Sequence, residues 1–272
     1  GPIKFSFDRW ILKRLIPSVE YSIVRDEKSK QQLLACGAKP ANIYQAHDPV
    51  LNFPLKKSTL DNPITQSTPY AVLSLRRWFF ANPFLPVFIT RNLNRVALFR
   101  KKYDAYMDQL AHDLDIYLEK HPHMTIVAVS LYDGEDDIVN QDLVAKMKYG
   151  NKIKIAKTGM DEIAYLSIVS GANFVIGMRL HSLILGAVLS KPFVALRYSA
   201  KVDEFAKQMG LSDVSIHVER YDSKALQTGL SKMSLEFDTY ARSVEAKLAE
   251  YQTDNKAAFK ALNQRIRQVL AD

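Results

Sequence analysis

Residues 174–184, FVIGMRLHSLI, form the clearest junction between a strand and a helix in this chain. The first three residues are large and apolar, as in a buried strand, and Gly177 then allows the backbone to turn sharply. Arg179 follows the turn, and His181 falls where the free backbone N–H groups of the next helix begin. This combination suits an anionic substrate that must also exchange a proton. The competing interpretation is that His181 only caps the helix and Arg179 pairs with a core acid.

Short apolar runs alternate with amphipathic segments on both sides of this junction. The runs fall at residues 71–75, 125–131, 153–156, 174–177, 193–196 and 214–218, and the expected helices at about 96–119, 136–149, 161–170, 181–189, 202–209 and 223–233. This alternation predicts a doubly wound α/β domain over residues 70–234, with a parallel sheet and helices on both faces. Ligands of such sheets bind where strands end and helices begin, so the junction at 174–184 is the first candidate site.

The remaining segments predict a second, smaller part of the molecule. Residues 1–57 hold only two expected strands, at 21–24 and 43–50, with one helix between them, which is too little for an independent doubly wound domain. We interpret residues 1–57 as the remnant of a larger, Rossmann-like N-terminal domain, and residues 58–69, rich in Ser, Thr, Pro and Asn, as a linker. Apolar residues spaced three and four apart predict one long helix over 235–272, which we expect to pack back across the domain boundary.

Composition and charge exclude several classes of protein. Of 272 residues, 47% are hydrophobic and 24% are charged, which is ordinary for a globular protein and excludes disorder of the whole chain. The single cysteine, Cys36, cannot form an internal disulfide, and no apolar run approaches the ~18 residues that span a bilayer, so we expect a cytoplasmic protein. The net charge of +8 favours anionic partners. No zinc-ligand spacing or nucleic-acid-binding motif accompanies this charge, so we expect neither a metal nor nucleic acid.

Several sequence blocks occur in an order that is typical of one family. The blocks are GMRLHSLI at 177–184, KPFVAL at 191–196 and YSAKVDEF at 198–205, preceded by VRDEKS at 24–29, Asp48-Pro49 and LSLR at 73–76. Together they closely resemble the signature of the polysaccharide pyruvyl transferases, and the resemblance covers most of residues 20–211. The first block, with the lysine downstream of it, is specific, whereas the two earliest pieces are weak when taken alone.

The resemblance implies a fold and a reaction. The fold is similar to that of the GT-B glycosyltransferases, with two Rossmann-like doubly wound domains and an active site between them, the N-terminal domain being shortened here. The reaction moves a pyruvyl group from phosphoenolpyruvate onto two hydroxyls of a sugar, which forms a cyclic ketal and releases phosphate. The acceptor belongs to a cell-surface polysaccharide or its lipid-linked precursor. No cofactor is implied, because phosphoenolpyruvate is the donor substrate.

The chemistry of this reaction can be matched to residues. Proton transfer requires a group that titrates near neutral pH, and His181 is the natural general acid and base. The carboxylate and phosphate of the donor require fixed cations. We expect these to be Arg25, Arg179 and Lys201, with Arg76 next, and Gly177 and Ser182 to complete the substrate-binding set.

Each of these assignments has an alternative. Arg25 could form local ion pairs with Asp26 and Glu27. Lys201 begins a helix, where the helix dipole disfavours a cation, so an anionic ligand explains its position better than local stability does. Only one of Arg76 and its neighbour Arg77 can face the site on strand alternation. Acidic residues 136 and 137 open a helix and are expected to cap it, with contact to sugar hydroxyls as the second interpretation.

An unusually aromatic segment lies early in the predicted large domain. Aromatic side chains beside cations are typical of contact with an anionic membrane surface, and the residues expected to make it are Trp78, Phe79, Phe80, Phe84, Arg91 and Arg95. The alternative is that these rings fill the core beneath a long loop.

Two other functions also remain open. They are a GT-B glycosyltransferase that uses a nucleotide sugar, and a non-catalytic protein that binds phosphates or glycans.

Overall fold

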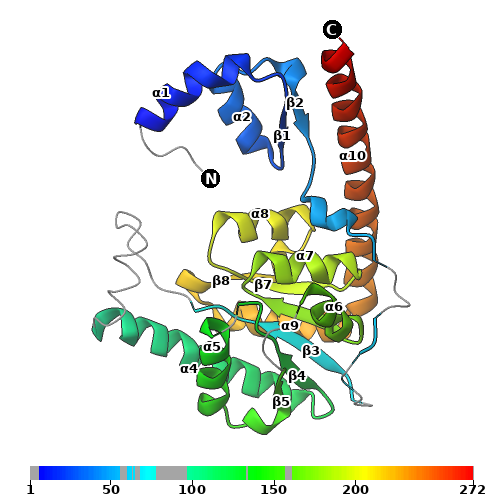
Figure 1. Ribbon diagram of the computed structural model, residues 1–272. Coiled ribbons are helices and arrows are strands. Elements are labelled where there is room, and N and C mark those ends of the chain that lie inside the picture. The colour runs from blue at the N-terminus through cyan, green and yellow to red at the C-terminus, as the bar shows by residue number, and fades with distance from the viewer. Residues whose placement is uncertain are drawn as a thin grey trace. The chain divides into compact units, whose positions relative to one another are not determined.

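The computed structural model describes residues 6–55, 60–62, 64, 68–77, 97–132, 134–156 and 161–271. The chain divides into two compact units. The larger unit is residues 55–245, and the smaller unit combines residues 1–54 with residues 246–272. Each unit contains its own parallel sheet (Figure 1).

The larger unit is built on a six-stranded sheet with the order β5-β4-β3-β6-β7-β8. Its strands are β3 (Tyr70–Ser74), β4 (Thr125–Ala128), β5 (Ile153–Ile155), β6 (Phe174–Gly177), β7 (Phe193–Arg197) and β8 (Ile216–His217). All neighbouring strands run parallel. The chain therefore starts in the middle of the sheet, adds strands toward one edge, and then returns to extend the other edge from β6. This is the doubly wound order, in which the switch point lies between β3 and β6.

Helices cover both faces of this sheet (Figure 1). One face carries α4 (Ala97–Lys120), α5 (Glu135–Lys146) and α9 (Ser223–Leu235), and the other carries α6 (Glu162–Ser170), α7 (Leu180–Val188) and α8 (Ala200–Gln208). Right-handed crossovers produce this division, because the chain reverses its direction across the sheet after β5. Every residue of β3 and β6 is buried, as expected for strands that are covered on both faces. The mixed α/β fold with parallel sheets is the one predicted from the sequence.

The smaller unit holds a two-stranded parallel sheet of β1 (Ser22–Val24) and β2 (Ile43–Gln45). Its helices are α1 (Ser6–Leu15), α2 (Glu27–Ala35) and the later part of α10 (Phe237–Ala271). The strand expected over residues 43–50 ends at Gln45 in the structure. The reason is the pair Asp48-Pro49, because the Asp48 carboxylate accepts a hydrogen bond from the Val50 N–H and proline fixes a turn. Short 3-10 turns complete the chain at Ile16–Ser18, Pro40–Asn42, Pro49–Asn52, Gly150–Lys152, Ser212–Val214 and Val218–Arg220.

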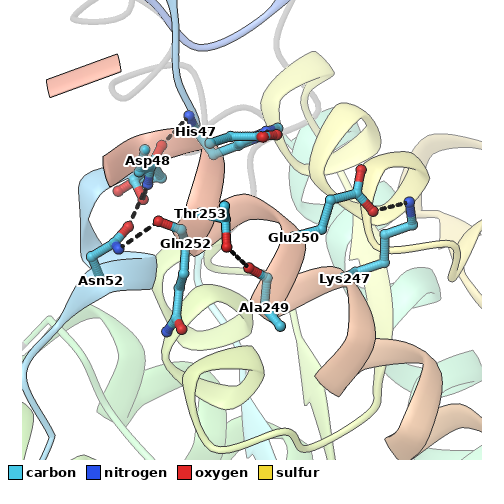
Figure 2. A network of polar contacts seen from close by, with 10 residues as sticks. His47, Asp48, Asn52, Lys247, Ala249, Glu250, Gln252 and Thr253 are labelled. Carbon is cyan, nitrogen blue, oxygen red and sulfur yellow. Dashed lines mark hydrogen bonds and ion pairs between the residues drawn. The ribbon is translucent and has the colours of Figure 1, made fainter. Parts of the chain in front are cut away.

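Within the smaller unit, α10 is held to the segment after β2 by a polar network (Figure 2). The His47 N–H donates to Asn255 Oδ1 at 2.6 Å, and Asn255 Nδ2 donates to Asn52 Oδ1 at 2.6 Å. The Asn52 amide donates in turn to the carbonyl of Gln252 at 3.1 Å. The His47 ring also stacks on Tyr251, with ring centroids 3.6 Å apart. Asn255 is fully buried, so these bonds are shielded from water.

Candidate functional site

The candidate site lies at the carboxyl ends of the central strands of the larger unit. Strands β4, β3, β6 and β7 are consecutive neighbours in the sheet, and their register brings Ser74 opposite Gly177. The loops that follow them therefore emerge at one edge, on either side of the switch point. These loops carry the predicted site residues of this unit.

The turn after β6 depends on Gly177. A Cβ atom at this position would lie 2.6 Å from Leu183 Cδ2 and 2.7 Å from Ser182 Oγ. Only glycine therefore lets the first turn of α7 pack this close to the end of the strand. The sequence predicted Gly177 and Ser182 as substrate-binding residues, but Ser182 is fully buried and its hydroxyl donates to the Arg179 carbonyl at 2.6 Å. Both residues shape the turn, and the Ser182 hydroxyl points at the main chain.

Arg179 forms a two-point ion pair with a buried carboxylate. Its Nε and Nη2 donate to Asp136 Oδ2 and Oδ1 at 2.6 and 2.5 Å. The Asp136 carboxylate is fully buried and also accepts the backbone N–H groups of Leu131 and Tyr132. The alternative interpretation, that Arg179 pairs with a core acid, therefore describes this contact. The Nη1 group makes no hydrogen bond within the described residues, and the Arg179 side chain keeps 20% of its surface exposed.

Asp137, which follows Asp136 in the first turn of α5, caps this helix as expected. Asp137 accepts the Gly134 N–H at 3.1 Å at the start of α5 and also accepts the Ser130 hydroxyl at 2.5 Å. The role of Asp136 as the partner of Arg179 was missed from the sequence. Its position in the sequence could have indicated this role, because Asp136 opens a helix at the same edge of the sheet as Arg179.

His181 and Lys201 occupy equivalent positions on neighbouring helices. Each is the second residue of its helix, α7 or α8, and these helices follow the paired strands β6 and β7. Both side chains are exposed and make no hydrogen bond or ion pair within the described residues. The N-cap residue of α8, Ser199, also leaves its hydroxyl without a capping bond. An imidazole and an ammonium group thus remain available beside two helix N-termini, which favour anions.

Arg76 connects the end of β3 to the loop before α8. Its Nη1 donates to the Tyr198 hydroxyl at 2.7 Å, and its guanidinium carbon lies 4.8 Å from the centroid of the Tyr198 ring. Its Nε is buried without a hydrogen-bond partner in the described part of the chain. The charge of Arg77 acts on Tyr103 instead. Burial raises the pKa of Tyr103, and the positive charge of Arg77 partly opposes this rise. That only one of the two arginines faces the site stays a prediction, and the contact between Arg76 and Tyr198 was not predicted from the sequence.

Arg25 belongs to the smaller unit and forms an ion pair with Asp48. The two residues follow β1 and β2, which are neighbouring parallel strands. The local ion pairs considered from the sequence are not the contact that forms, because Asp26 caps α2 by accepting the Ser29 N–H at 2.7 Å. The Arg25 side chain stays 47% exposed.

The sequence also predicts contact with a membrane and the absence of a metal site. The aromatic and cationic residues expected at a membrane, Trp78, Phe79, Phe80, Phe84, Arg91 and Arg95, lie outside the described residues. Within the described ranges, no helix has the length and apolar character that a membrane span needs. The same ranges contain no group of three or more His, Cys, Asp or Glu side chains arranged to hold a metal ion.

Comparison with known proteins gives a family and a fold. A family model described as polysaccharide pyruvyl transferase matches residues 1–200. No curated protein matches the chain significantly. Solved structures of sugar-nucleotide enzymes resemble it at low sequence identity, which supports a GT-B-like fold and nothing beyond the fold.

Three of these structures illustrate the resemblance. A UDP complex of Staphylococcus aureus MnaA has a TM-score of 0.65 at 11% identity, covering 99% of this chain and 65% of that one. Anabaena HepE in complex with UDP-glucose has a TM-score of 0.55 at 13% identity, covering 97% and 70%. UDP-GlcNAc 2-epimerase from Methanocaldococcus jannaschii has a TM-score of 0.52 at 15% identity, covering 79% and 54%. The chain thus spans between 54% and 70% of the length of these structures.

Proposed function

This chain belongs to the polysaccharide pyruvyl transferase family, and from that premise we propose that it moves a pyruvyl group from phosphoenolpyruvate onto two hydroxyls of one sugar. The product is a cyclic ketal, and phosphate is released. The acceptor is a sugar of a cell-surface polysaccharide or of its lipid-linked precursor. The membership itself supports a transferase role with a saccharide acceptor.

One observation carries the proposal: His181 and Lys201 are both exposed and both lack a protein partner within the described residues. A cation at the start of a helix is disfavoured by the helix dipole, so Lys201 adds no local stability there. Phosphoenolpyruvate would offset this cost, because its phosphate or carboxylate can bind the ammonium group and the free N–H groups of the first turn. The imidazole of His181 lies on the neighbouring helix, where it supplies the proton-transfer group that the reaction needs.

The proposed reaction can be written with each proton assigned. His181 donates a proton to the methylene carbon of phosphoenolpyruvate, and the first sugar hydroxyl attacks the adjacent carbon, which bears the phosphate. His181 recovers a proton from that hydroxyl. The bond between this carbon and the phosphate oxygen then breaks, phosphate leaves with the bonding electrons, and the second hydroxyl closes the ring. The proton of the second hydroxyl leaves with phosphate or with water.

The cations contribute unequally in this proposal. Lys201 offers its full charge, whereas the charge of Arg179 is largely neutralised by Asp136. Arg179 can still present its Nη1 group to the substrate while the ion pair holds the rest of the guanidinium in place. Arg76 is oriented by Tyr198 and contributes its remaining donors. Arg25 lies in the smaller unit, and its part in substrate binding stays a prediction.

Donor preference tests this function. The protein is incubated with phosphoenolpyruvate and an extract of lipid-linked saccharides, and released phosphate and the mass of the acceptor are measured. We expect phosphate release together with an acceptor that gains a pyruvyl group, and loss of both in His181→Ala with the fold intact. Activity retained in His181→Ala removes His181 from the mechanism. Consumption of a nucleotide sugar instead would establish the glycosyltransferase alternative.

We propose that this reaction takes place in the cytoplasm, at the inner face of the cell membrane, because a lipid-linked acceptor resides in the bilayer. Contact through Trp78, Phe79, Phe80, Phe84, Arg91 and Arg95 is part of this proposal. Co-sedimentation with vesicles tests it. Binding to anionic but not to neutral vesicles is expected, and no binding to anionic vesicles rules out the contact.

A further inference from the structure

A small cavity opens at the carboxyl ends of β7 and β8, next to the candidate site. Its volume is about 190 Å³, and its lining includes Arg197, Tyr198, Ser199, Asp203, His217 and Glu219. Tyr198 is shared between the two regions, because its hydroxyl accepts the hydrogen bond from Arg76. The cavity therefore adjoins the cations that we propose for phosphoenolpyruvate.

Three polar groups around this cavity lack partners within the described part of the chain. The Nε of Arg197 is buried without a hydrogen bond, although its Nη1 donates to Asp203 at 2.8 Å and its Nη2 to the Ser215 carbonyl at 2.9 Å. The Ser199 hydroxyl does not cap α8, and the exposed Glu219 carboxylate makes no ion pair. Only Arg197 Nε is buried. The Ser199 hydroxyl and the Glu219 carboxylate lie where a ligand can reach them, and one that offers hydroxyl groups could bind both.

The charges around the cavity disfavour an anion. Arg197 is already paired with Asp203, which also accepts Lys207 at 2.9 Å. Burial raises the pKa of Asp203, but hydrogen bonds from Lys207 and Arg197 outweigh it and lower the pKa overall, so this carboxyl is ionised at neutral pH. The Glu219 carboxylate then leaves an uncompensated negative charge at the rim. A neutral ligand rich in hydroxyl groups suits this cavity better than phosphoenolpyruvate does.

We propose that this cavity is the acceptor subsite and binds one hexopyranose ring of the saccharide. The proposal rests on the function proposed above. Ser199 and Glu219 bind ring hydroxyls. His217 is available on the rim, because its Nε2 lies 3.9 Å from Asp203 Oδ1, too far for a hydrogen bond. The volume is below the range of about 300–1,000 Å³ typical of drug-sized ligands, which suits a single sugar ring.

Saccharide binding without turnover tests the subsite directly. Saturation-transfer NMR is recorded on the chain with a set of methyl hexopyranosides that differ in which hydroxyl is axial. We expect at least one hexoside to bind, and Glu219→Gln to weaken it about tenfold, since hydrogen bonds to charged groups are the strong ones. Ser199→Ala is expected to weaken it about fivefold. The matched control is Glu204→Gln, an exposed carboxylate of α8 outside the cavity lining, and it should bind like the wild type.

The outcomes separate the subsite from the proposed function. Failure of the wild type to bind any of the hexosides overturns the subsite, as does equal binding by the wild type and both cavity variants. Phosphate release from phosphoenolpyruvate is measured in parallel. Transfer with an unchanged KM for the saccharide in Glu219→Gln overturns the subsite and leaves the function intact. Hexoside binding through Glu219 without any consumption of phosphoenolpyruvate overturns the acceptor role and the function, and leaves a sugar-binding cavity.

Discussion

Asp136 and Arg179 are joined by two parallel hydrogen bonds of 2.6 and 2.5 Å, with the carboxylate fully buried. The same carboxylate accepts two backbone N–H groups of the loop after β4, so one side chain fixes both that loop and the guanidinium. Arg179 is therefore held in one orientation before any ligand arrives. Such preorganisation is what a group that contacts a substrate requires.

Asp136→Ala should strongly destabilise the larger unit. Removing one partner of a buried ion pair leaves an uncompensated charge, and the expected loss is about 3–5 kcal/mol in the free energy of unfolding. Denaturant unfolding monitored by circular dichroism measures it. The exposed carboxylate variant Glu204→Ala is the control and should change stability by less than about 0.5 kcal/mol. Equal stability of the two variants contradicts a structural role for the pair.

Gly177→Ala should destabilise the protein by about 1–3 kcal/mol, because the added methyl group overpacks the turn against Leu183 and Ser182. Thermal unfolding measures the change. Gly186→Ala serves for comparison, because its added methyl group would meet Val175 Cγ2 at 3.1 Å, a tight contact but a longer one than those at Gly177, so a smaller loss is expected. Combining Gly177→Ala with Ser182→Ala should recover part of the loss. A Gly177→Ala variant as stable as the wild type would show that the turn can relax.

Lys201→Gln should separate donor binding from stability. Loss of a charge-assisted contact to the donor is expected to raise the Kd for phosphoenolpyruvate about tenfold or more. Stability should stay equal or rise by a few tenths of a kcal/mol, because a cation is removed from a helix N-terminus. Calorimetric titration with phosphoenolpyruvate and thermal unfolding measure the two effects. Lys224→Gln, at an exposed lysine in the first turn of α9, should show the same small change in stability and no change in donor affinity. Unaltered donor affinity in Lys201→Gln contradicts the proposed role.

Asp213 should make stability depend on pH in the acid range. Burial raises the pKa of Asp213, but hydrogen bonds from Lys232 and Tyr240 outweigh it and hold the pKa below the ordinary value of 3.8. A lowered folded-state pKa contributes stability that is fully present above the unfolded pKa and lost as pH falls through the folded pKa. Asp213→Asn should therefore be less stable than the wild type at pH 7, and the difference should shrink below about pH 4.

Denaturant midpoints at neutral and acid pH measure the difference in stability between the wild type and Asp213→Asn. Asp161→Asn serves for comparison, because it replaces an exposed helix cap without a cationic partner in the described residues. A difference between the wild type and Asp213→Asn that stays constant down to the lowest pH contradicts the assignment.

The parts of the fold that follow from local sequence were predictable. The strand and helix at 174–184 were predicted because continuous apolar residues, a glycine and a helical pattern agree there. The strand expected to reach residue 50 stops at Gln45 because the side chain of Asp48 competes for backbone hydrogen bonds, an effect that apolar patterning does not register.

The position of the candidate site was easier to predict from the sequence than the contacts between its residues. Strand order at the switch point brings Arg76, Arg179, His181 and Lys201 to one edge, and a strand-end pattern is enough to see this. The pairing of Arg179 with Asp136 joins residues 43 positions apart, and that of Arg76 with Tyr198 joins residues 122 apart. Such partners depend on tertiary packing, so several residues at the same edge were equally good candidates on sequence alone.

The network between His47 and Asn255 has a consequence for the order of folding. It joins residues 208 positions apart, whereas the six strands of the larger unit lie within residues 70–217. Contacts between distant residues form late, because a long loop must close before they contribute. During synthesis the larger unit can fold while the last part of α10 is still inside the ribosome. The smaller unit is completed only when residues 47 and 255 are both outside the ribosome, so the emergence of residue 255 is the step that allows it to close.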